Sequence, residues 1–396
     1  MKICMIGALN GLSSPVRGGP ERAFKNIIRG AIKYDQENEY IFVPLGFQEN
    51  VPLALNSHIR LYPTPIPIAS TLIIGHPYWA QAKKHVIRVI NRERPDVVLC
   101  HDPLFITFVP HDIRKRTILI LHGPFWKGYS LLYPSLKFMN KLIYRRFVLN
   151  KLSWLNIKTL PLIICVAKCL QQELPSRLRV KSVVLENPVN EEFFNLSRKN
   201  WSLNSDGKYH IISVGGIKPL KNHETLILAV KEILNRGKLF RTKLKAKIIG
   251  FYEDSFNWYY RELVSLIQKY SLNDVIDIAT DLEDNALRDE YINADICVHT
   301  GLIEGLPNAV QEAMAVGLPI IATRSGDIPL IIKHKYNGFL FSGCDYKKLA
   351  SYIELLMNDP RLARSISKKA RETAYLRWSL EGYITKLNQI LKRFIN

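Results

Sequence analysis

Two successive series of short apolar runs, each alternating with helical patterns, constrain the fold of this 396-residue chain more than any other feature. Several of these runs are apolar throughout, which is typical of parallel strands covered on both faces. Strand–helix alternation of this kind predicts a doubly wound α/β sheet. The expected strands are 2–7, 40–44, 97–101, 117–122, 163–166 and 182–186 in the first series, and 210–214, 245–250, 275–279, 294–299 and 318–322 in the second. The expected helices include 21–32, 78–91, 222–234, 346–357, 360–375 and 380–394.

A polar, irregular segment at 187–207 separates the two series and predicts a domain boundary. We therefore expect two Rossmann-like domains, residues 1–195 and 196–375, followed by a C-terminal helix, 376–396, that packs back toward the N-terminal domain. Open α/β sheets bind ligands beyond the carboxyl ends of their strands. Two such sheets facing one another across a cleft would suit an enzyme with two substrates.

Targeting and membrane-spanning signals are weak in this sequence. The N-terminal sequence MKICMIGALNG stops being apolar at Gly7 and is typical of a strand, not of a secretion signal. The most apolar later stretches, 161–167 and 67–74, are much shorter than the roughly 20 residues of a spanning helix. The six cysteines lie mostly in apolar runs, as buried, reduced thiols do. These features predict a cytoplasmic protein.

The net charge of +20 is concentrated in the first half of the chain, where no acidic residue occurs between Asp112 and Glu173. Within this stretch, residues 136–155 (LKFMNKLIYRRFVLNKLSWL) interleave apolar and basic side chains. The pattern predicts a helix that lies on an anionic membrane, peripherally on its inner face. A helix packed on the sheet with a basic outer face would give the same pattern. No recognised nucleic-acid-binding module is present, so we expect no nucleic-acid partner.

The strongest motif is HTGLIEGLPNAVQEAMAVGLPIIAT at residues 299–323. A strand is expected to end at its start, and a helix to run from Pro307, at the first helical position, to Gly317 at its end. The N-terminus of such a helix presents backbone N–H groups that suit a phosphate. Glu304 and Glu312 would accept hydrogen bonds from sugar hydroxyls. Alternatively, Glu312 faces solvent or caps a neighbouring loop.

This motif resembles the E-x7-E signature of the GT-B, family 4 type retaining glycosyltransferases (glycosyl transferases group 1). The resemblance implies that Glu304 binds hydroxyls of a donor sugar and Glu312 those of the nucleotide's ribose. It also implies that the N–H groups around Gly305, Leu306 and Asn308 hold the diphosphate. The sequence Ser325-Gly326-Asp327-Ile328-Pro329 resembles the family's S-G-G-x-P-E loop, with Asp327 and Leu330 as departures.

Residues 213–230 (SVGGIKPLKNHETLILAV) resemble the family's V-G-R-x-x-x-x-K-G segment, in which an arginine and a lysine neutralise the diphosphate. Lys221 occupies the lysine position and Gly216 the arginine position. Lys218, two residues further on, could replace the missing charge, although an ammonium lacks the fork of a guanidinium. A solvated loop lysine is the alternative.

Two motifs in the first half complete the resemblance. Gly18 and Gly19 match the family's G-G-x-E loop, which implies that the backbone of Gly19 lies against the donor. His122 follows an apolar strand at a position whose histidine contacts the donor sugar in the family. His101 matches the second histidine of the family's D-V-V-H-x-H pattern, whose first histidine is absent here. A structural role is the alternative for both histidines.

The resemblance therefore implies a hexosyl glycosyltransferase of polysaccharide biosynthesis. It would move a sugar from a nucleotide-diphosphate sugar to a hydroxyl of a lipid-linked or cell-surface glycan, with retention of configuration. No D-x-D loop and no His/Cys cluster has metal-ligand spacing, so we expect neither a metal nor another cofactor. Two alternatives stay open: an inactive sugar-nucleotide-binding protein, which the glycine at position 216 favours, and a non-hydrolysing sugar-nucleotide epimerase.

Overall fold

The computed structural model describes most of the chain, and its described residues form two compact units. The described residues are 1–12, 14, 18–47, 54–64, 77–123, 153–196, 206–237, 242–252 and 254–395. The first unit comprises Met1–Ser14, Gly19–Pro188 and Leu380–Asn396, and the second comprises Pro15–Gly18 and Val189–Ser379. Each unit is described by itself below.

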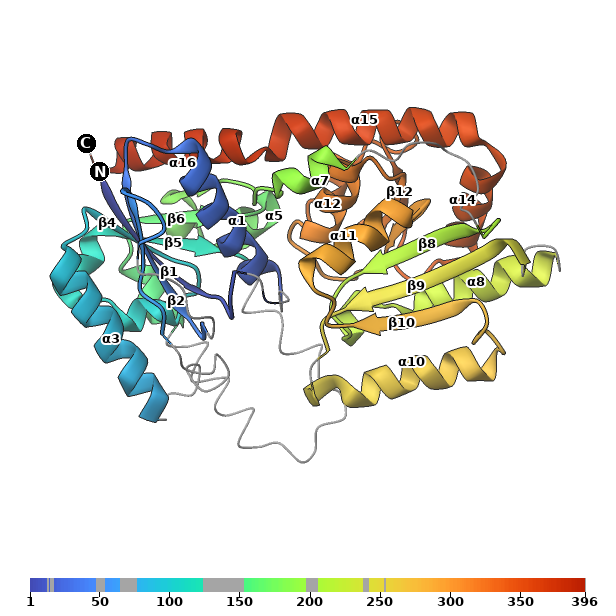
Figure 1. Cartoon of the computed structure of the whole chain (residues 1–396), viewed down its shortest axis with the longest axis horizontal. Coiled ribbons are helices and arrows are strands. Elements are labelled where there is room, and N and C mark those ends of the chain that lie inside the picture. Colours follow the sequence, from blue (N-terminus) through green and yellow to red (C-terminus); the bar gives the residue numbers. More distant parts are fainter. Residues whose placement is uncertain are drawn as a thin grey trace. The chain divides into compact units, whose positions relative to one another are not determined.

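The first unit is built on a parallel sheet of seven described strands in the order β3-β2-β1-β4-β5-β6-β7 (Figure 1). The strands are β1 (Lys2–Ala8), β2 (Glu39–Leu45), β3 (Ile59–Leu61), β4 (Val97–Cys100), β5 (Thr117–Leu121), β6 (Leu162–Cys165) and β7 (Ser182–Val184). The helices of this unit are α1 (Gly19–Tyr34), α3 (Pro77–Glu93), α5 (Lys168–Glu173), α6 (Ser176–Arg179) and α16 (Leu380–Ile395), with short 3-10 helices η1 (Phe105–Phe108) and η2 (His111–Arg116).

The second unit repeats this architecture with six described strands in the order β10-β9-β8-β11-β12-β13. The strands are β8 (Tyr209–Val214), β9 (Leu244–Gly250), β10 (Ile276–Thr280), β11 (Ile296–His299), β12 (Ile320–Thr323) and β13 (Phe339–Phe341). Its helices are α7 (Glu191–Asn195), α8 (Glu224–Arg236), α10 (Asn257–Lys269), α11 (Asp284–Asn293), α12 (Asn308–Val316), α13 (Ile328–Ile331), α14 (Tyr346–Asn358) and α15 (Pro360–Trp378), with 3-10 turns η3 (Pro219–Lys221) and η4 (Asp254–Phe256).

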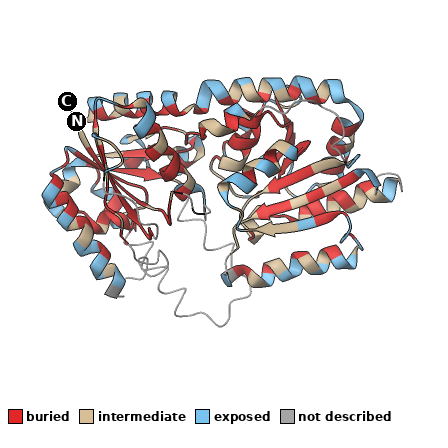
Figure 2. Ribbon diagram, in the orientation of Figure 1, coloured by how far each residue is buried: buried red, intermediate tan, exposed pale blue. Residues whose placement is uncertain are grey.

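Strands β1 and β4 of the first sheet and β11 and β12 of the second are buried almost throughout (Figure 2). This burial explains the continuous apolar runs, because a parallel strand covered by helices on both faces exposes neither set of side chains to water. The predicted fold class, two Rossmann-like α/β domains, is confirmed. In the part of the chain that the structure describes, no helix is long and apolar enough to cross a bilayer.

Two local predictions were incomplete. Strand β3 was not predicted, because its three residues are too few to show a period. Pro307 was expected at the first helical position of the motif helix, but it is the N-cap of α12, with φ −69° and ψ 128°. Its extended backbone lets α12 start at Asn308 instead.

Helix α16 belongs to the first unit, where it packs against α1. Tyr383, Ile384 and Leu387 are buried on its inner face. Gly30 of α1 allows a close approach, since a Cβ there would lie 3.0 Å from the Ile384 side chain. Asn388 donates a 2.7 Å hydrogen bond to Asp35 at the end of α1.

Helix α12, which carries Glu312, is capped by Gly317. The backbone conformation of Gly317 is one that only glycine adopts without strain. Gly317 has φ +83° and caps the helix, and its N–H donates to the carbonyls of Ala313 and Met314. We expect Gly317→Ala to lower the free energy of unfolding by about 1 kcal/mol, because a left-handed conformation is costly for a residue with a Cβ.

Urea denaturation measures this change, with Gly123→Ala as the control. Gly123 is not among the described glycines with a positive φ, and a Cβ there would meet no described atom within 4 Å. Equal stabilities of the two variants would contradict the interpretation.

Candidate functional site

A carboxylate and an ammonium group meet at the carboxyl end of the second unit's sheet. Glu304 lies in the loop between β11 and α12, and its Oε1 accepts a 2.6 Å hydrogen bond from Nζ of Lys221. Nε2 of His299, the last residue of β11, lies 3.0 Å from the same oxygen. Only 9% of the Glu304 side chain is exposed. The loop therefore holds an ionised carboxylate that is nearly removed from water.

Glycines make this geometry possible. A Cβ at Gly301 would lie 2.2 Å from Oε1 of Glu304 and 2.8 Å from Nε2 of His299, so a side chain there would displace the carboxylate. Gly326, with φ +54°, approaches the same loop, and a Cβ there would lie 2.2 Å from the carbonyl oxygen of Gly305. Gly301 thus leaves room for the Glu304 carboxylate, and Gly326 lets its own backbone pass close to the Glu304 loop.

The Ser325–Asp327 segment is hydrogen-bonded to the backbone of the Glu304 loop. The hydroxyl of Ser325 donates to the carbonyl of Leu302 at 2.9 Å, and the N–H of Asp327 donates to the carbonyl of Gly305 at 2.8 Å. Thr323, at the end of β12, donates to the carbonyl of Gly301 at 2.6 Å. These bonds fix the backbone from which Glu304 projects.

Lys221 reaches Glu304 because its own loop is tied to the β11 loop. The hydroxyl of Thr300 donates to the carbonyl of Lys221 at 2.7 Å, and the N–H of Leu302 donates to the carbonyl of Leu220 at 2.9 Å. Asn222 turns the chain after η3 with φ 52°, a left-handed conformation that asparagine tolerates. The strands β8 and β11 that lead into these loops are neighbours in the sheet.

The ionised state of Glu304 results from its partners. Burial by itself raises the pKa of this carboxyl, but the charge of Lys221 and the hydrogen bond from His299 outweigh burial and lower the pKa to about 2. Glu304 is therefore an anion at neutral pH and can only accept hydrogen bonds.

The start of α12 offers backbone donors beside Glu304. Among the described residues, the N–H groups of Gly305 and Leu306 donate to no protein acceptor. Asn308, the first residue of the helix, is half-buried. The positive end of a helix and unpaired N–H groups together suit an anion.

Glu312 does not face solvent, so that alternative is wrong. It is 3% exposed, on the second turn of α12, and accepts a 3.1 Å hydrogen bond from the Tyr291 hydroxyl of α11. Sequence reasoning did not single out Tyr291, because 21 residues separate it from Glu312.

Gly216 and Lys218 lie side by side at the turn after β8. A Cβ at Gly216 would lie 3.5 Å from Cε of Lys218, an ordinary contact, and the φ of Gly216 is not positive. The position would thus accept a side chain, and the Lys218 side chain passes next to that space. Beneath the turn, Nε2 of the buried His223 lies 3.3 Å from the Gly216 carbonyl oxygen.

The remaining candidate residues lie in the first unit, apart from Gly18, which directly precedes α1. Gly19 is the first residue of α1, and both glycines are exposed. Glu21, on the first turn of α1, accepts a 2.8 Å hydrogen bond from the N–H of Asn10, which follows β1. His122 directly follows β5, and its Nε2 lies 2.9 Å from Nδ1 of His101, which follows β4. The basic segment 136–155 falls almost entirely outside the described residues.

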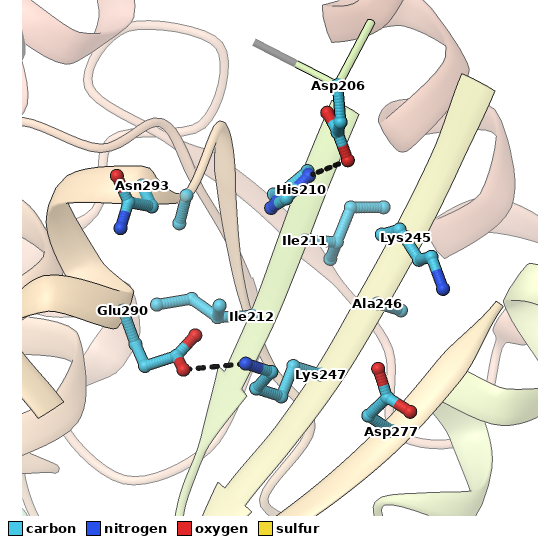
Figure 3. Close-up of a pocket in the computed structure, with 11 residues that line it drawn as sticks. Asp206, His210, Ile211, Ile212, Lys245, Ala246, Lys247, Asp277, Glu290 and Asn293 are labelled. Atoms are coloured by element: carbon cyan, nitrogen blue, oxygen red, sulfur yellow. Dashed lines mark hydrogen bonds and ion pairs between the residues drawn. The ribbon is translucent and has the colours of Figure 1, made fainter. Parts of the chain in front are cut away.

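A separate pocket of about 160 Å³ opens at the amino ends of the second unit's strands (Figure 3). Four of its side chains form pairs: Lys247 with Glu290 at 2.6 Å, and His210 with Asp206 at 3.0 Å. Ligands of open α/β sheets bind at the opposite edge. We therefore place the candidate site at Glu304 and Lys221 and not in this pocket.

Metal ligands are not grouped in the described ranges: no cluster of three or more His, Cys, Asp or Glu side chains there could hold an ion. Activity without a metal stays a prediction.

Two family models together match most of the sequence. Residues 197–373 match glycosyl transferases group 1, and residues 17–193 match glycosyltransferase family 4. Among curated relatives, the putative colanic acid biosynthesis glycosyltransferase WcaL of Escherichia coli K12 is 28% identical over 169 residues, 41% of this chain and 39% of the relative. D-inositol 3-phosphate glycosyltransferase 2 of Catenulispora acidiphila is 28% identical over 176 residues, 44% of this chain and 41% of the relative. The matched part thus spans about two fifths of the length of these relatives.

Solved structures resemble the whole chain in fold. Sucrose-phosphate synthase from Thermosynechococcus elongatus superposes with a TM-score of 0.79 at 17% identity, covering 99% of this chain and 98% of that one. Anabaena HepE, solved in complex with UDP and glucose, superposes with a TM-score of 0.71 at 16% identity, covering 99% of each chain.

The buried His223 predicts a pH dependence of stability. Burial lowers its pKa from 6.5 to about 4. As the pH falls through 6.5, His223 becomes protonated in the unfolded chain but stays neutral in the folded chain. The stabilisation of the folded state by neutral His223 is therefore complete above pH 6.5 and is lost between pH 6.5 and 4. We expect His223→Gln to reduce the loss of unfolding free energy over this range by about 1 kcal/mol per pH unit.

Urea denaturation at several pH values measures this slope, and the glutamine amide can still donate to the carbonyl of Gly216. An unchanged slope in His223→Gln would show that other groups carry the pH dependence.

Proposed function

We propose that this chain, which belongs to the group 1 glycosyltransferases of the GT-B fold, transfers a hexose from a nucleotide-diphosphate sugar to an acceptor hydroxyl with retention of configuration. One observation carries the proposal: the ion pair between Lys221 and Glu304 lies beside the unpaired N–H groups of Gly305 and Leu306. In one site with little water, the ammonium and N–H groups suit the diphosphate of such a donor, and the carboxylate suits the hydroxyls of its sugar.

A diphosphate would bind to the donors of this site. The N–H groups at the start of α12 and the ammonium of Lys221 would hold its oxygens, and Lys218 would supply a second cation where the glycine at position 216 has none. Anabaena HepE, which shares the fold, is described with UDP and glucose, which supports a nucleotide-sugar donor.

The sugar would bind to the carboxylate. Lys221 now donates to Glu304, and a diphosphate that reaches this ammonium would compete with the carboxylate for it. Glu304 would then keep the contact with His299 and accept hydrogen bonds from sugar hydroxyls. Donor binding thus exchanges one buried pair for two interactions, one with each half of the donor, and neither charge is left without a partner. Glu312 would bind the ribose.

The transfer step needs charge stabilisation more than a base. The bond between the anomeric carbon and the phosphate oxygen breaks, the acceptor oxygen bonds to that carbon from the same face, and the acceptor proton passes to the departing phosphate. Negative charge grows on the diphosphate, and Lys221 with the helix N–H groups would stabilise it without reorganising. His122 would contact the donor sugar.

We further propose that the acceptor is a lipid-linked or cell-surface glycan, reached from the cytoplasm at the inner face of the membrane. The name of the relative WcaL, a putative colanic acid biosynthesis glycosyltransferase, supports a polysaccharide acceptor. The basic segment 136–155 would attract anionic lipid, as its composition predicts.

The ion pair itself can be tested against a matched pair at the other end of the same sheet. We expect Glu304→Gln and Lys221→Met each to lower turnover about 100-fold or more, because each removes a group that acts on the transition state. Glu290→Gln and Lys247→Met break a pair of equal length, 2.6 Å, and should change turnover less than about twofold.

Turnover is measured as release of nucleoside diphosphate from UDP-, GDP- and ADP-glucose, with the donor's stereochemistry analysed in parallel. Equal losses in both sets of variants, or none in either, would contradict the proposal. Recovery of an epimerised donor would indicate an epimerase, and binding without turnover an inactive sugar-nucleotide-binding protein.

A rescue experiment can test whether Lys218 supplies the positive charge that the glycine at position 216 lacks. We expect Lys218→Ala to weaken binding of the preferred nucleotide sugar about tenfold, the loss of one charge-assisted hydrogen bond. Adding Gly216→Arg to that variant should restore binding, because position 216 has room for a side chain.

Thermal shifts with a panel of UDP-, GDP- and ADP-sugars report this binding, since a ligand of the native state raises its apparent stability. Wild-type affinity in Lys218→Ala would show that Lys218 is only a solvated loop residue.

A further inference from the structure

Two nitrogen atoms from neighbouring strand ends approach Oε1 of Glu304. Nζ of Lys221, in the loop after β8, lies 2.6 Å from this oxygen, and Nε2 of His299, the last residue of β11, lies 3.0 Å from it. The side chain of His299 is only 4% exposed. A donor that draws the Lys221 ammonium to its diphosphate would therefore leave the His299 ring beside the carboxylate.

His299 has a defined position at the strand end. It pairs in register with Ala322 of β12. Two residues later, the carbonyl of Gly301 accepts a 2.6 Å hydrogen bond from the hydroxyl of Thr323. A Cβ at Gly301 would lie 2.8 Å from Nε2 of His299 and 2.2 Å from Oε1 of Glu304, so the glycine keeps the space beside the imidazole and the carboxylate open.

The carboxylate determines the direction of its hydrogen bond with His299. Burial raises the pKa of the Glu304 carboxyl, but its partners, with the charge of Lys221 first among them, lower the pKa to about 2. Glu304 is therefore ionised at pH 7, and an ionised carboxylate carries no proton and can only accept. Nε2 of His299 must then carry a proton and donate it, whether the ring is neutral or charged.

A carboxylate with so little contact to water depends on the donors around it, because its desolvation is costly. Only 9% of the Glu304 side chain is exposed. While Lys221 faces Glu304, the ammonium and the imidazole both hold Oε1. Once a diphosphate competes for the ammonium, the Nε2–H group of His299 still donates to Oε1, and the carboxylate keeps its place while a sugar approaches.

We infer that His299 is a positioning residue for the donor sugar: its Nε2–H group holds Glu304 in place while Lys221 binds the diphosphate. His299 acts through Glu304, so a protein that lacks this carboxylate should no longer depend on His299. The role toward a sugar rests on the proposed function, whereas the direction of the hydrogen bond does not.

The direction of the hydrogen bond can be measured in the wild-type protein. In a sample with 15N-labelled histidine at pH 7, the ring nitrogen shifts should show Nε2 of His299 protonated, with the signals assigned by their absence in His299→Gln. An unprotonated Nε2 would overturn the inference, whatever the enzyme's activity.

Three variants test whether the donor group matters. His299→Gln places an amide nitrogen near the position of Nε2 and should keep the affinity for the preferred nucleotide sugar within about twofold. His299→Asn, whose amide reaches only the position of Nδ1, and His299→Leu, which has no donor, should each weaken binding about tenfold, the value of one charge-assisted hydrogen bond.

A second background separates positioning from a structural role. In Glu304→Ala, adding His299→Leu should weaken binding less than about twofold, because the group that His299 holds is gone. Isothermal titration calorimetry with UDP-, GDP- and ADP-glucose measures these affinities. Equal weakening by His299→Leu in both backgrounds, or equal affinities of His299→Gln and His299→Leu, would overturn the positioning role.

Failure of the proposed function gives a different result. A wild-type protein that binds none of these nucleotide sugars would overturn the proposed function and, with it, the role of His299 toward a sugar. The nitrogen spectrum would still decide whether His299 donates to Glu304.

Discussion

The ion pair between Lys221 and Glu304 is the interaction on which the second unit's site depends. Its two residues lie 83 positions apart, at the ends of β8 and β11, and they meet because these strands are neighbours in one parallel sheet. A buried ion pair adds little net stability, since desolvation of both charges offsets their attraction. The pair is held by its surroundings: a glycine at 301 leaves room for the carboxylate, and Nε2 of His299 lies 3.0 Å from the same carboxylate oxygen.

The first unit uses the same construction with different chemistry. His101 and His122 also follow adjacent parallel strands, and they too meet each other before they meet any ligand. Burial lowers the pKa of both imidazoles, whereas the buried carboxylate of Glu304 keeps its charge because an ammonium faces it.

Much of this could be predicted from the sequence, for identifiable reasons. The apolar runs predicted the parallel strands, and the motif at 299–323 predicted the helix that follows Glu304. Contacts between distant segments could not be predicted, because no local pattern reports them: Tyr291 against Glu312 is one example. The departure at Asp327 shows a further limit. Its backbone N–H, not its side chain, bonds to the carbonyl of Gly305, so the loop keeps its place although the residue type differs from the family's.

Helix α16 has a consequence for how the protein is made. Its apolar face completes the core around α1, yet it follows the whole second unit in the chain. On the ribosome, the first unit would emerge early and wait with part of α1 uncovered, while the second unit, almost entirely one continuous segment, could fold in the meantime. The half that is synthesised first is thus the half that is finished last.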